Sequence, residues 1–258
     1  MQSKLIDFAK YSSLKIGPKI EVKVLEYGDT LPTGHFLIGG ANNLLVSNNP
    51  LPLAILGKDF DFMRIEESSV VVGCATKTGR LLSFAKKNNL ANFEFVAKLP
   101  GTIGGMLAMN AGVKAYEVFN IIDEIKIDDK WVKKEDIEYG YRFAKLGGVA
   151  TEVKFKLEYG YNEKLKEELL ALRDNQPSEP SAGSFFKNPE GDYAGRLIEA
   201  VGLKGKQIGN MAFSQMHANF LVNLGGGSYE EAIELTNLAK KLVFEEFGVL
   251  LKEEVKLI

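Results

Sequence analysis

The sequence predicts an α+β protein with two domains. Short apolar runs of strand length dominate residues 1–155, whereas helical periodicity prevails after residue 160. The charged helix predicted over 161–175 ends where prolines at positions 177 and 180 interrupt the chain, and the domain boundary is expected near the start of that helix. The length of 258 residues suits one large or two medium domains.

Six apolar runs in the first part have the length and the β-branched content of strands. They are residues 21–26, 36–38, 53–56, 70–73, 121–127 and 149–157. One helix interrupts them over 79–88, where apolar side chains recur on one face, and Thr78 is the expected N-cap. The first part is therefore predicted to be rich in β-structure.

A highly charged amphipathic helix is predicted over 161–175, and a domain boundary near its start. We therefore expect a first domain over residues 1–158, closed by a C-terminal strand over 252–258, and a second domain over 159–251. Within the second domain, a helix over 192–200 precedes a strand over 218–224.

The last long helix is predicted over 229–247. Ser228 followed by Glu231 forms a capping-box pattern at its start, and Gly248 ends it. Two short strands, 249–251 and 254–258, are expected to follow.

Composition excludes several classes of protein. The net charge of −2 argues against a nucleic-acid binder that relies on a broad positive field. Because Cys74 is the single cysteine, an intramolecular disulfide is excluded, and we expect Cys74 to be a small, buried apolar residue. The two histidines alone cannot form a zinc site. The N-terminus lacks an apolar signal core, and no apolar run has transmembrane length. We expect a cytoplasmic protein that does not bind membranes.

Two glycine-rich turns fall in the first domain, each with small or polar neighbours. The first is Ile38-Gly39-Gly40-Ala41-Asn42-Asn43-Leu44-Leu45, and the second is Leu99-Pro100-Gly101-Thr102-Ile103-Gly104-Gly105-Met106, followed by Met109-Asn110-Ala111-Gly112. Glycines can expose successive backbone N–H groups to a pyrophosphate, although either turn taken singly reads more readily as structural. Neither turn matches a nicotinamide Rossmann motif or a Walker loop. Together they predict a dinucleotide site.

The segment Ser181-Ala182-Gly183-Ser184-Phe185-Phe186-Lys187-Asn188-Pro189 is the most informative in the chain. Its small residues allow close approach of a ligand to the Ser184 hydroxyl, while the two phenylalanines anchor the turn in a core. Lys187 and Asn188 offer donors to an anionic ligand. In isolation, the segment also fits a tight turn with a solvated lysine.

With these motifs in order, the whole chain resembles the UDP-N-acetylenolpyruvoylglucosamine reductase family. The residues that carry the resemblance are Gly39–Leu45, 100–112, Tyr141-Arg142, 176–189, Gly202-Leu203-Lys204-Gly205, His217-Ala218-Asn219-Phe220 and Glu254-Val255. The chain resembles the compact type, because few residues separate Arg142 from Ser184 and leave no room for an extra tyrosine-bearing loop.

The resemblance implies a flavoenzyme of peptidoglycan synthesis. Its first domain would have the FAD-binding fold of vanillyl-alcohol-oxidase (PCMH) type, and its C-terminal α+β domain would bind the substrate. The expected reaction is the reduction of UDP-N-acetylglucosamine enolpyruvate to UDP-N-acetylmuramate, with NADPH as hydride donor. We expect non-covalent FAD, because neither His35 nor Cys74 is an obvious tether, and we expect a monomer.

Three catalytic residues follow from the resemblance by position. Arg142 matches the catalytic arginine, Ser184 the proton donor and Glu254 the C-terminal glutamate. These residue types suit the chemistry, since an arginine fork can hold a growing carboxylate-conjugated anion while a hydroxyl delivers a proton. Without the resemblance, a surface arginine and an edge-strand glutamate would be the simpler interpretations.

The remaining site residues are assigned in the same way. The expected FAD-binding residues are Gly39, Gly40, Ala41, Asn42, Asn43, Leu44, Pro100, Gly101, Thr102, Gly104, Gly105, Asn110, Ala111 and Gly112. The expected substrate-binding residues are Tyr141, Arg142, Lys187 and Asn188. The chain departs from the family at Ala144, where serine is usual, and at Ala41-Asn42, where Gly-Ser is usual.

Two other interpretations remain open. A different FAD-dependent oxidoreductase of the same fold, acting on a hydroxy acid, would explain both glycine turns but not Ser184 together with Glu254. A non-enzymatic nucleotide-binding or scaffold protein is the second, since a fold alone does not establish a function.

Overall fold

The computed structural model describes residues 1–97, 99–172 and 174–258 and divides into two compact units. The first unit contains residues 1–4, 22–40 and 52–174, and the second contains residues 5–21, 41–51 and 175–258. This division differs from the predicted domains. The predicted boundary at residue 158 lies inside the first unit, and the C-terminal segment 252–258 belongs to the second.

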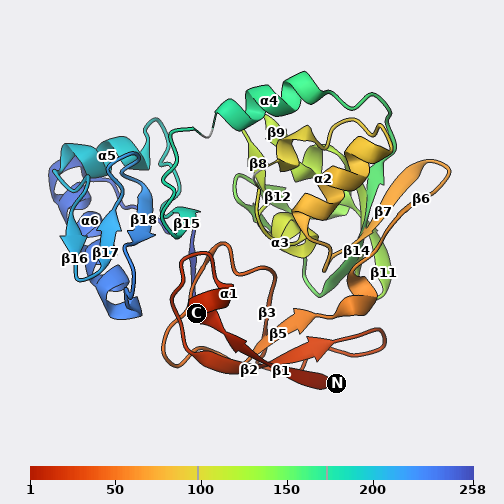
Figure 1. The fold of residues 1–258 in the computed structure, drawn as a ribbon, viewed down its shortest axis with the longest axis horizontal. Coiled ribbons are helices and arrows are strands. Elements are labelled where there is room, and N and C mark those ends of the chain that lie inside the picture. Colours follow the sequence, from red (N-terminus) through yellow and green to blue (C-terminus); the bar gives the residue numbers. More distant parts are fainter. Residues whose placement is uncertain (98, 173) are drawn as a thin grey trace. The chain divides into compact units, whose positions relative to one another are not determined.

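An antiparallel five-stranded sheet forms the framework of the first unit (Figure 1). Its strands, in spatial order, are β11 (Lys130–Lys133), β10 (Ile122–Ile127), β14 (Ala150–Lys156), β7 (Ser69–Gly73) and β6 (Met63–Ile65). Val70, Val72 and Phe155 are fully buried and pack in one core with residues of helices α2 (Thr78–Lys87) and α3 (Ile103–Ala108). The near-continuous burial of β7 and of the first half of β14 explains why their apolar runs were recognisable in the sequence.

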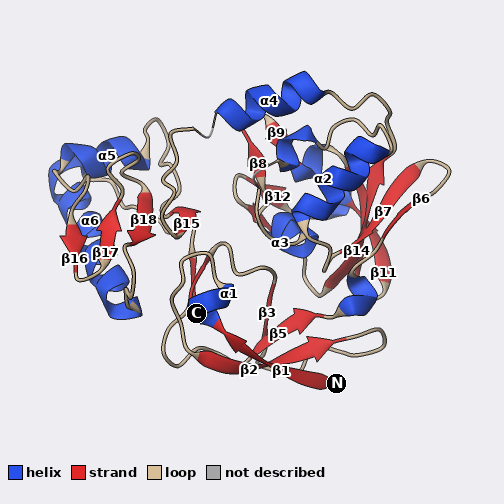
Figure 2. Ribbon diagram, in the orientation of Figure 1, coloured by secondary structure: helices blue, strands red, loops and turns tan. Residues whose placement is uncertain are grey.

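Smaller elements complete this part of the chain (Figure 2). A second sheet has the order β1 (Gln2–Asp7), β2 (Lys19–Leu25), β5 (Leu53–Leu56) and β3 (Phe36–Ile38), in which β2, β5 and β3 are parallel. Two hairpins are β8 (Gly112–Val113) with β9 (Tyr116–Glu117) and β12 (Tyr139–Gly140) with β13 (Phe143–Ala144). The other helices are α4 (Glu163–Ala171) and the 3₁₀ turns η1 (Lys58–Phe60), η2 (Glu94–Val96), η3 (Val118–Asn120) and η4 (Lys134–Asp136).

The second unit is built on a four-stranded antiparallel sheet with helices packed against it. The strand order is β15 (Ser181–Ser184), β18 (Phe220–Asn223), β17 (Met211–Phe213) and β16 (Gln207–Ile208). Helices α5 (Ala194–Ala200) and α6 (Tyr229–Phe247) contribute to its core, and α1 (Phe8–Tyr11) is a single short turn. In the same unit, β19 (Lys256–Leu257) pairs in parallel with β4 (Leu44–Leu45).

The predicted secondary structure is confirmed for most elements. All six predicted strands are present within a few residues of their expected bounds, and the strands over 36–38 and 53–56 have those bounds. Helix α6 starts with the predicted capping box, in which the Ser228 hydroxyl accepts from Glu231 N and the Glu231 carboxylate accepts from Ser228 N. Gly248 ends it in the left-handed conformation, with φ of 68°.

Three predictions on local structure were wrong. Thr78 is not an N-cap, because it is the first helical residue and its hydroxyl donates to the Leu99 carbonyl at 2.5 Å. Residues 249–251 form no strand. The helix expected over 161–175 spans only Glu163–Ala171, because the Asn162 side chain accepts from Leu165 N and begins it there; residue 173 lies outside the described residues.

Within the described parts of the chain, no helix is both long enough and apolar enough to cross a lipid bilayer.

Candidate active site

The two glycine turns lie against each other in the first unit. A Cβ atom added to Gly39 would lie 2.5 Å from the Thr102 hydroxyl oxygen and 3.5 Å from the Gly105 backbone. Thr102 caps α3, and its hydroxyl accepts from Gly105 N at 3.3 Å. Only glycine at position 39 therefore allows this approach.

In the second glycine turn, the N–H groups of residues 103–105 are hydrogen-bonded within the protein. Ile103 N donates to the Thr76 carbonyl at 2.9 Å, and Gly104 N donates to the Cys74 carbonyl at 2.9 Å. Gly105 N is engaged by Thr102. The expectation that successive N–H groups of this turn face a ligand is wrong for residues 103–105, where the glycines instead serve close packing of the backbone. Gly101 accepts from Thr78 N through its carbonyl, and Pro100 is exposed.

The first turn continues into the second unit at Ala41. Ala41 has φ of 51°, a left-handed conformation that favours glycine, and it is 3% exposed. The backbone here is fixed by Ser13, whose N–H donates to the Ala41 carbonyl and whose hydroxyl donates to the Asn42 carbonyl. The position where the chain departs from the family's usual glycine thus keeps a glycine-like backbone. Leu44 lies in β4 and is buried.

Arg142 occupies a two-residue turn between β12 and β13. Its φ of 60° is again left-handed, which is an uncommon conformation for arginine. The guanidinium is half-buried, donates to the Gly112 carbonyl at 3.3 Å and lies 5.1 Å from the centre of the Tyr141 ring. The structure therefore brings Arg142 to the end of the second glycine segment.

Asn110, predicted to bind the cofactor, is fully buried and hydrogen-bonded within the protein. Its amide nitrogen donates to the Glu117 carboxylate at 2.8 Å and to the Gly140 carbonyl at 3.1 Å. The neighbouring residue Ala111 is bonded through its backbone to Met106 and Val118.

Ser184 and Glu254 lie on adjacent segments of the second unit. Glu254 N donates at 2.8 Å to the carbonyl of Phe185, the residue that follows Ser184. The next residue along, Phe186, forms an antiparallel bridge with Glu253. Asn43 holds the same segment, since its amide donates to the Glu254 carbonyl at 3.0 Å. The backbone of Glu254 is therefore bonded to the residue that follows Ser184, although the two positions are 70 residues apart in the sequence.

The predicted anchoring of this segment is confirmed. Phe185 and Phe186 are each 1% exposed and stack edge to face with ring centres 5.0 Å apart. Gly183 has φ of 82°, and a Cβ placed there would meet nothing within 4 Å, so the space where a side chain at position 183 would lie is open. Lys187 is half-buried, while the side chain of exposed Asn188 accepts from the N–H of Ala194, the first residue of α5, at 3.1 Å.

Asn219 is a residue whose role the sequence did not reveal. It is 2% exposed, and its carbonyl accepts from Phe185 N at 2.7 Å. Its side chain accepts from Phe186 N at 3.0 Å and donates to the Phe186 carbonyl at 2.8 Å. His217 Nδ1 accepts from Asn219 N at 3.2 Å, and burial lowers the pKa of His217. Asn219 thus fixes the backbone that follows Ser184, a role that only the tertiary structure reveals.

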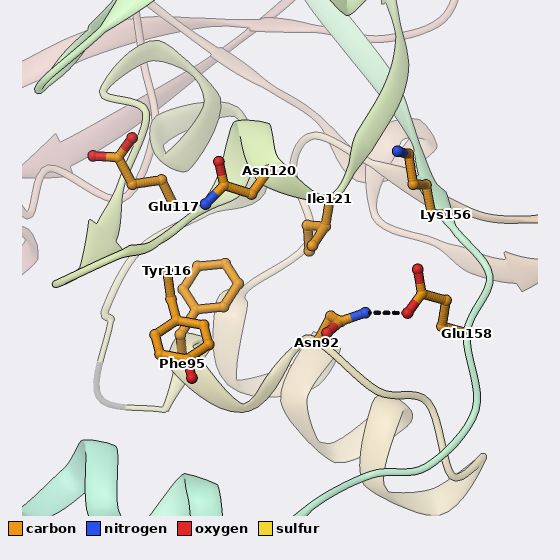
Figure 3. Close-up of a pocket in the computed structure, with 8 residues that line it drawn as sticks. All are labelled: Asn92, Phe95, Tyr116, Glu117, Asn120, Ile121, Lys156 and Glu158. Atoms are coloured by element: carbon orange, nitrogen blue, oxygen red, sulfur yellow. Dashed lines mark hydrogen bonds between the residues drawn. The ribbon is translucent and has the colours of Figure 1, made fainter.

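A separate pocket of about 300 Å³ lies in the first unit (Figure 3). Its lining residues are Asn92, Phe95, Tyr116, Glu117, Asn120, Ile121, Lys156 and Glu158. Figure 3 shows the hydrogen bond of 2.8 Å that Asn92 donates to Glu158 across one side. Among the described residues, none of those predicted for the site lines this pocket.

Comparisons with known proteins point to one family, and those with whole relatives cover nearly all of the chain. Residues 176–258 match the family model of the UDP-N-acetylenolpyruvoylglucosamine reductase C-terminal domain. The chain is 44% identical to UDP-N-acetylenolpyruvoylglucosamine reductase of Helicobacter hepaticus, with 100% of both proteins covered. It is 46% identical to the Campylobacter jejuni (strain RM1221) enzyme, with 98% of this chain and 100% of the relative covered.

Among solved structures, UDP-N-acetylenolpyruvylglucosamine reductase from Thermus caldophilus matches with a TM-score of 0.86. That match has 29% sequence identity and covers 100% of this chain and 99% of the other. It confirms the predicted fold class, α+β with a first domain of the vanillyl-alcohol-oxidase (PCMH) type and a C-terminal α+β domain. The chain therefore belongs to the UDP-N-acetylenolpyruvoylglucosamine reductase family, oxidoreductases that act on this UDP-sugar in the synthesis of peptidoglycan precursors.

Proposed function

We propose that this protein reduces the enolpyruvyl group of UDP-N-acetylglucosamine enolpyruvate to the lactyl group of UDP-N-acetylmuramate, using non-covalent FAD and NADPH. The observation that carries the proposal is the juxtaposition of Ser184 and Glu254 through the bond from Glu254 N to the Phe185 carbonyl. A hydroxy-acid oxidase of the same fold gives no reason for a serine and a glutamate to lie on segments that are bonded to each other in this way. We infer that the enzyme works in the cytoplasm as a monomer.

Arg142 is proposed to bind the substrate carboxylate and to stabilise the anion that forms when hydride reaches the enolpyruvyl methylene. A guanidinium is permanently charged and can donate two parallel bonds to a carboxylate. Its preorganised position matters, because donors already aimed at developing charge need no reorganisation during the reaction. The left-handed turn at Arg142 is consistent with such a role, since strained backbone tends to occur at functional sites.

Ser184 is proposed to protonate the carbon next to the carboxylate, with Glu254 acting on the same enolate. Gly183, where a Cβ would meet nothing within 4 Å, would let a substrate approach the backbone immediately before Ser184. The buried phenylalanine pair and Asn219 hold the backbone on the other side of Ser184. A positioned acid of this kind typically contributes about 10²–10⁴-fold in rate.

We propose that FAD is bound without a covalent bond. When bound, FAD would supply the carrier that accepts hydride from a nicotinamide and passes it to the substrate. We propose that the two glycine turns, with Asn42 and Thr102, hold it, and that Tyr141, Lys187 and Asn188 contact the UDP-sugar. Cys74 is unsuited as a tether, because it is 1% exposed and burial raises the pKa of its thiol.

Anaerobic half-reactions test the proposal. The purified protein should be yellow, should be bleached by NADPH, and should recover its colour on addition of the enolpyruvyl UDP-sugar but not of a simple 2-keto acid, the oxidised form of a hydroxy acid. Flavin should enter the supernatant on acid precipitation. Recovery of colour with a ketone product of a hydroxy acid, and none with the UDP-sugar, would favour the other flavoenzyme. A colourless protein that cannot be reconstituted with FAD would favour a scaffold.

A further inference from the structure

A buried asparagine, Asn110, joins three segments of the first unit. It is fully buried and has φ of 39°. Its Nδ2 donates to Glu117 Oε2 at 2.8 Å and to the Gly140 carbonyl at 3.1 Å. Its Oδ1 accepts from Phe119 N at 3.2 Å. Both amide hydrogens are therefore used within the protein, which leaves none for a ligand.

These bonds lead directly to Arg142. Gly140 is the last residue of β12, immediately before the Tyr141-Arg142 turn. On the other side of the turn, the Arg142 guanidinium donates to the carbonyl of Gly112, two residues after Asn110. The short segment 110–112 thus holds the Tyr141-Arg142 turn at two points. The Asn110 side chain binds the carbonyl of Gly140, just before the turn, and the Gly112 carbonyl accepts a hydrogen bond from the Arg142 guanidinium.

The hairpins on either side are tightly packed, so this arrangement has little freedom. A Cβ on Gly112 would lie 2.1 Å from the Tyr116 carbonyl oxygen, and one on Gly140 would lie 2.7 Å from the Phe143 ring. The left-handed backbone of Arg142 costs free energy and persists only where surrounding contacts determine it. The bond from Asn110 to Gly140 is one such contact.

We propose that Asn110 is a positioning residue for Arg142, rather than a side-chain ligand of the cofactor. It fixes the start of the turn, so that the guanidinium is already oriented when the substrate carboxylate arrives. This inference rests on the proposed role of Arg142 in the half-reaction with the enolpyruvyl substrate.

Asn110→Asp is the first test, because it preserves the shape of the side chain and an acceptor for Phe119 N. It removes both donors and sets a carboxylate against Glu117 and the Gly140 carbonyl. Reoxidation of the reduced enzyme by the enolpyruvyl UDP-sugar should slow by on the order of 10–10²-fold, the scale expected for small misplacement of a catalytic group. Reduction by NADPH should be unchanged.

A swapped pair separates positioning from stability. In N110D/E117Q, the new amide at position 117 can donate to the new carboxylate at position 110, which restores the bond between these positions. The bond to the Gly140 carbonyl stays broken. We expect the thermal midpoint to return towards that of the native protein while the substrate half-reaction stays slow. If the thermal midpoint and the rate of the substrate half-reaction recovered together, the proposal would be overturned. Should N110D not fold, this pair carries the test alone.

Two single variants are controls. Glu117→Gln keeps an acceptor for Asn110 and should leave the half-reactions unchanged. Asn120→Asp makes the same chemical change at an exposed asparagine in the neighbouring turn, where the amide donates to the Ala115 carbonyl at 2.8 Å. Slowing of the substrate half-reaction by Asn120→Asp equal to that by Asn110→Asp would count against a specific role.

A spectroscopic measurement tests the inference independently of activity. The chain has five arginines, so ¹⁵N-arginine labelling gives few guanidinium signals, and Arg142→Lys identifies the one that matters. That signal should shift or broaden in N110D and in N110D/E117Q but not in the controls. An unchanged signal in both would overturn the proposal. If the native protein itself were not reoxidised by the UDP-sugar, the proposed function would fail, whereas this measurement would still decide the positioning.

Discussion

The contact between the glycine turns predicts strong non-additivity between Gly39 and Thr102. In Gly39→Ala, the new methyl group would lie 2.5 Å from the Thr102 hydroxyl oxygen, whereas ordinary contact begins at 3.4 Å, so the two atoms must separate by about 0.9 Å. The bond from Gly105 N to Thr102, already 3.3 Å long, would then be lost. Overpacking of this kind costs about 1–3 kcal/mol. Loss of the N-cap in Thr102→Ala alone costs about 0.5–2 kcal/mol.

The double variant should be no less stable than Thr102→Ala alone, because the atom that clashes is gone. The coupling should therefore approach the full cost of Gly39→Ala. Urea unfolding measures this coupling energy on the cofactor-free native protein, the two single variants and the double variant. The four m-values must be equal for the comparison. Gly79→Ala is the matched control, since a Cβ there meets nothing within 4 Å and a helical alanine should maintain or raise stability. If the losses of unfolding free energy in the two single variants added up to that of the double variant within about 0.5 kcal/mol, the contact would be refuted.

Four further predictions address the residues of the site. Arg142→Ala should slow the substrate half-reaction by about 10²–10³-fold but spare reduction by NADPH; equal losses in stopped-flow traces of both half-reactions would assign Arg142 another role. Ser184→Ala should reduce turnover by at least about 10²-fold, and Ser184→Cys should recover part of it; turnover of Ser184→Ala within a few-fold of native would exclude the proton-donor role. Burial lowers the pKa of His217, so its contribution to stability is present above the unfolded value of 6.5 and is lost as pH falls below it. His217→Gln should therefore lose less free energy of unfolding than the native protein between pH 6.5 and about pH 5, and parallel pH curves would contradict this. Ala41→Gly should be nearly neutral, because relief of about 1–2 kcal/mol of left-handed strain offsets about 0.8 kcal/mol for the buried methyl group and about 0.4–1 kcal/mol of unfolded-state entropy; a loss of about 2 kcal/mol in urea unfolding would show that the backbone is not strained there.

Local signals predicted the elements whose structure depends on local contacts. Helix α6 is bounded by Ser228 with Glu231 and by Gly248, all of which act within one turn of the helix ends. The Thr78 prediction failed because its hydroxyl has a distant partner, Leu99, which no local rule could anticipate.

The candidate site could be predicted only as a set of motifs. The motifs identified Ser184 and Glu254, but the backbone pairing that brings them together depends on tertiary structure. The same holds for Asn219, since an asparagine inside an apolar strand region gives no sign that it bonds the main chain of Phe185 and Phe186. The prediction that successive N–H groups of the second glycine turn face a ligand was wrong for a related reason. The carbonyls of Thr76 and Cys74 already accept hydrogen bonds from the N–H groups of residues 103 and 104.

The bond from Asn43 to the Glu254 carbonyl joins residues 211 positions apart, and it has a kinetic consequence. Contacts of such long range carry a large loop-closure entropy, so they tend to form late in folding. The parallel pairing of β4 with β19, which holds the same segment, joins residues nearly as far apart in sequence, such as Leu44 and Lys256. Glu254 would thus reach its place beside Ser184 only near the end of folding. In a refolding experiment, enzyme activity should therefore return after most of the secondary structure has formed.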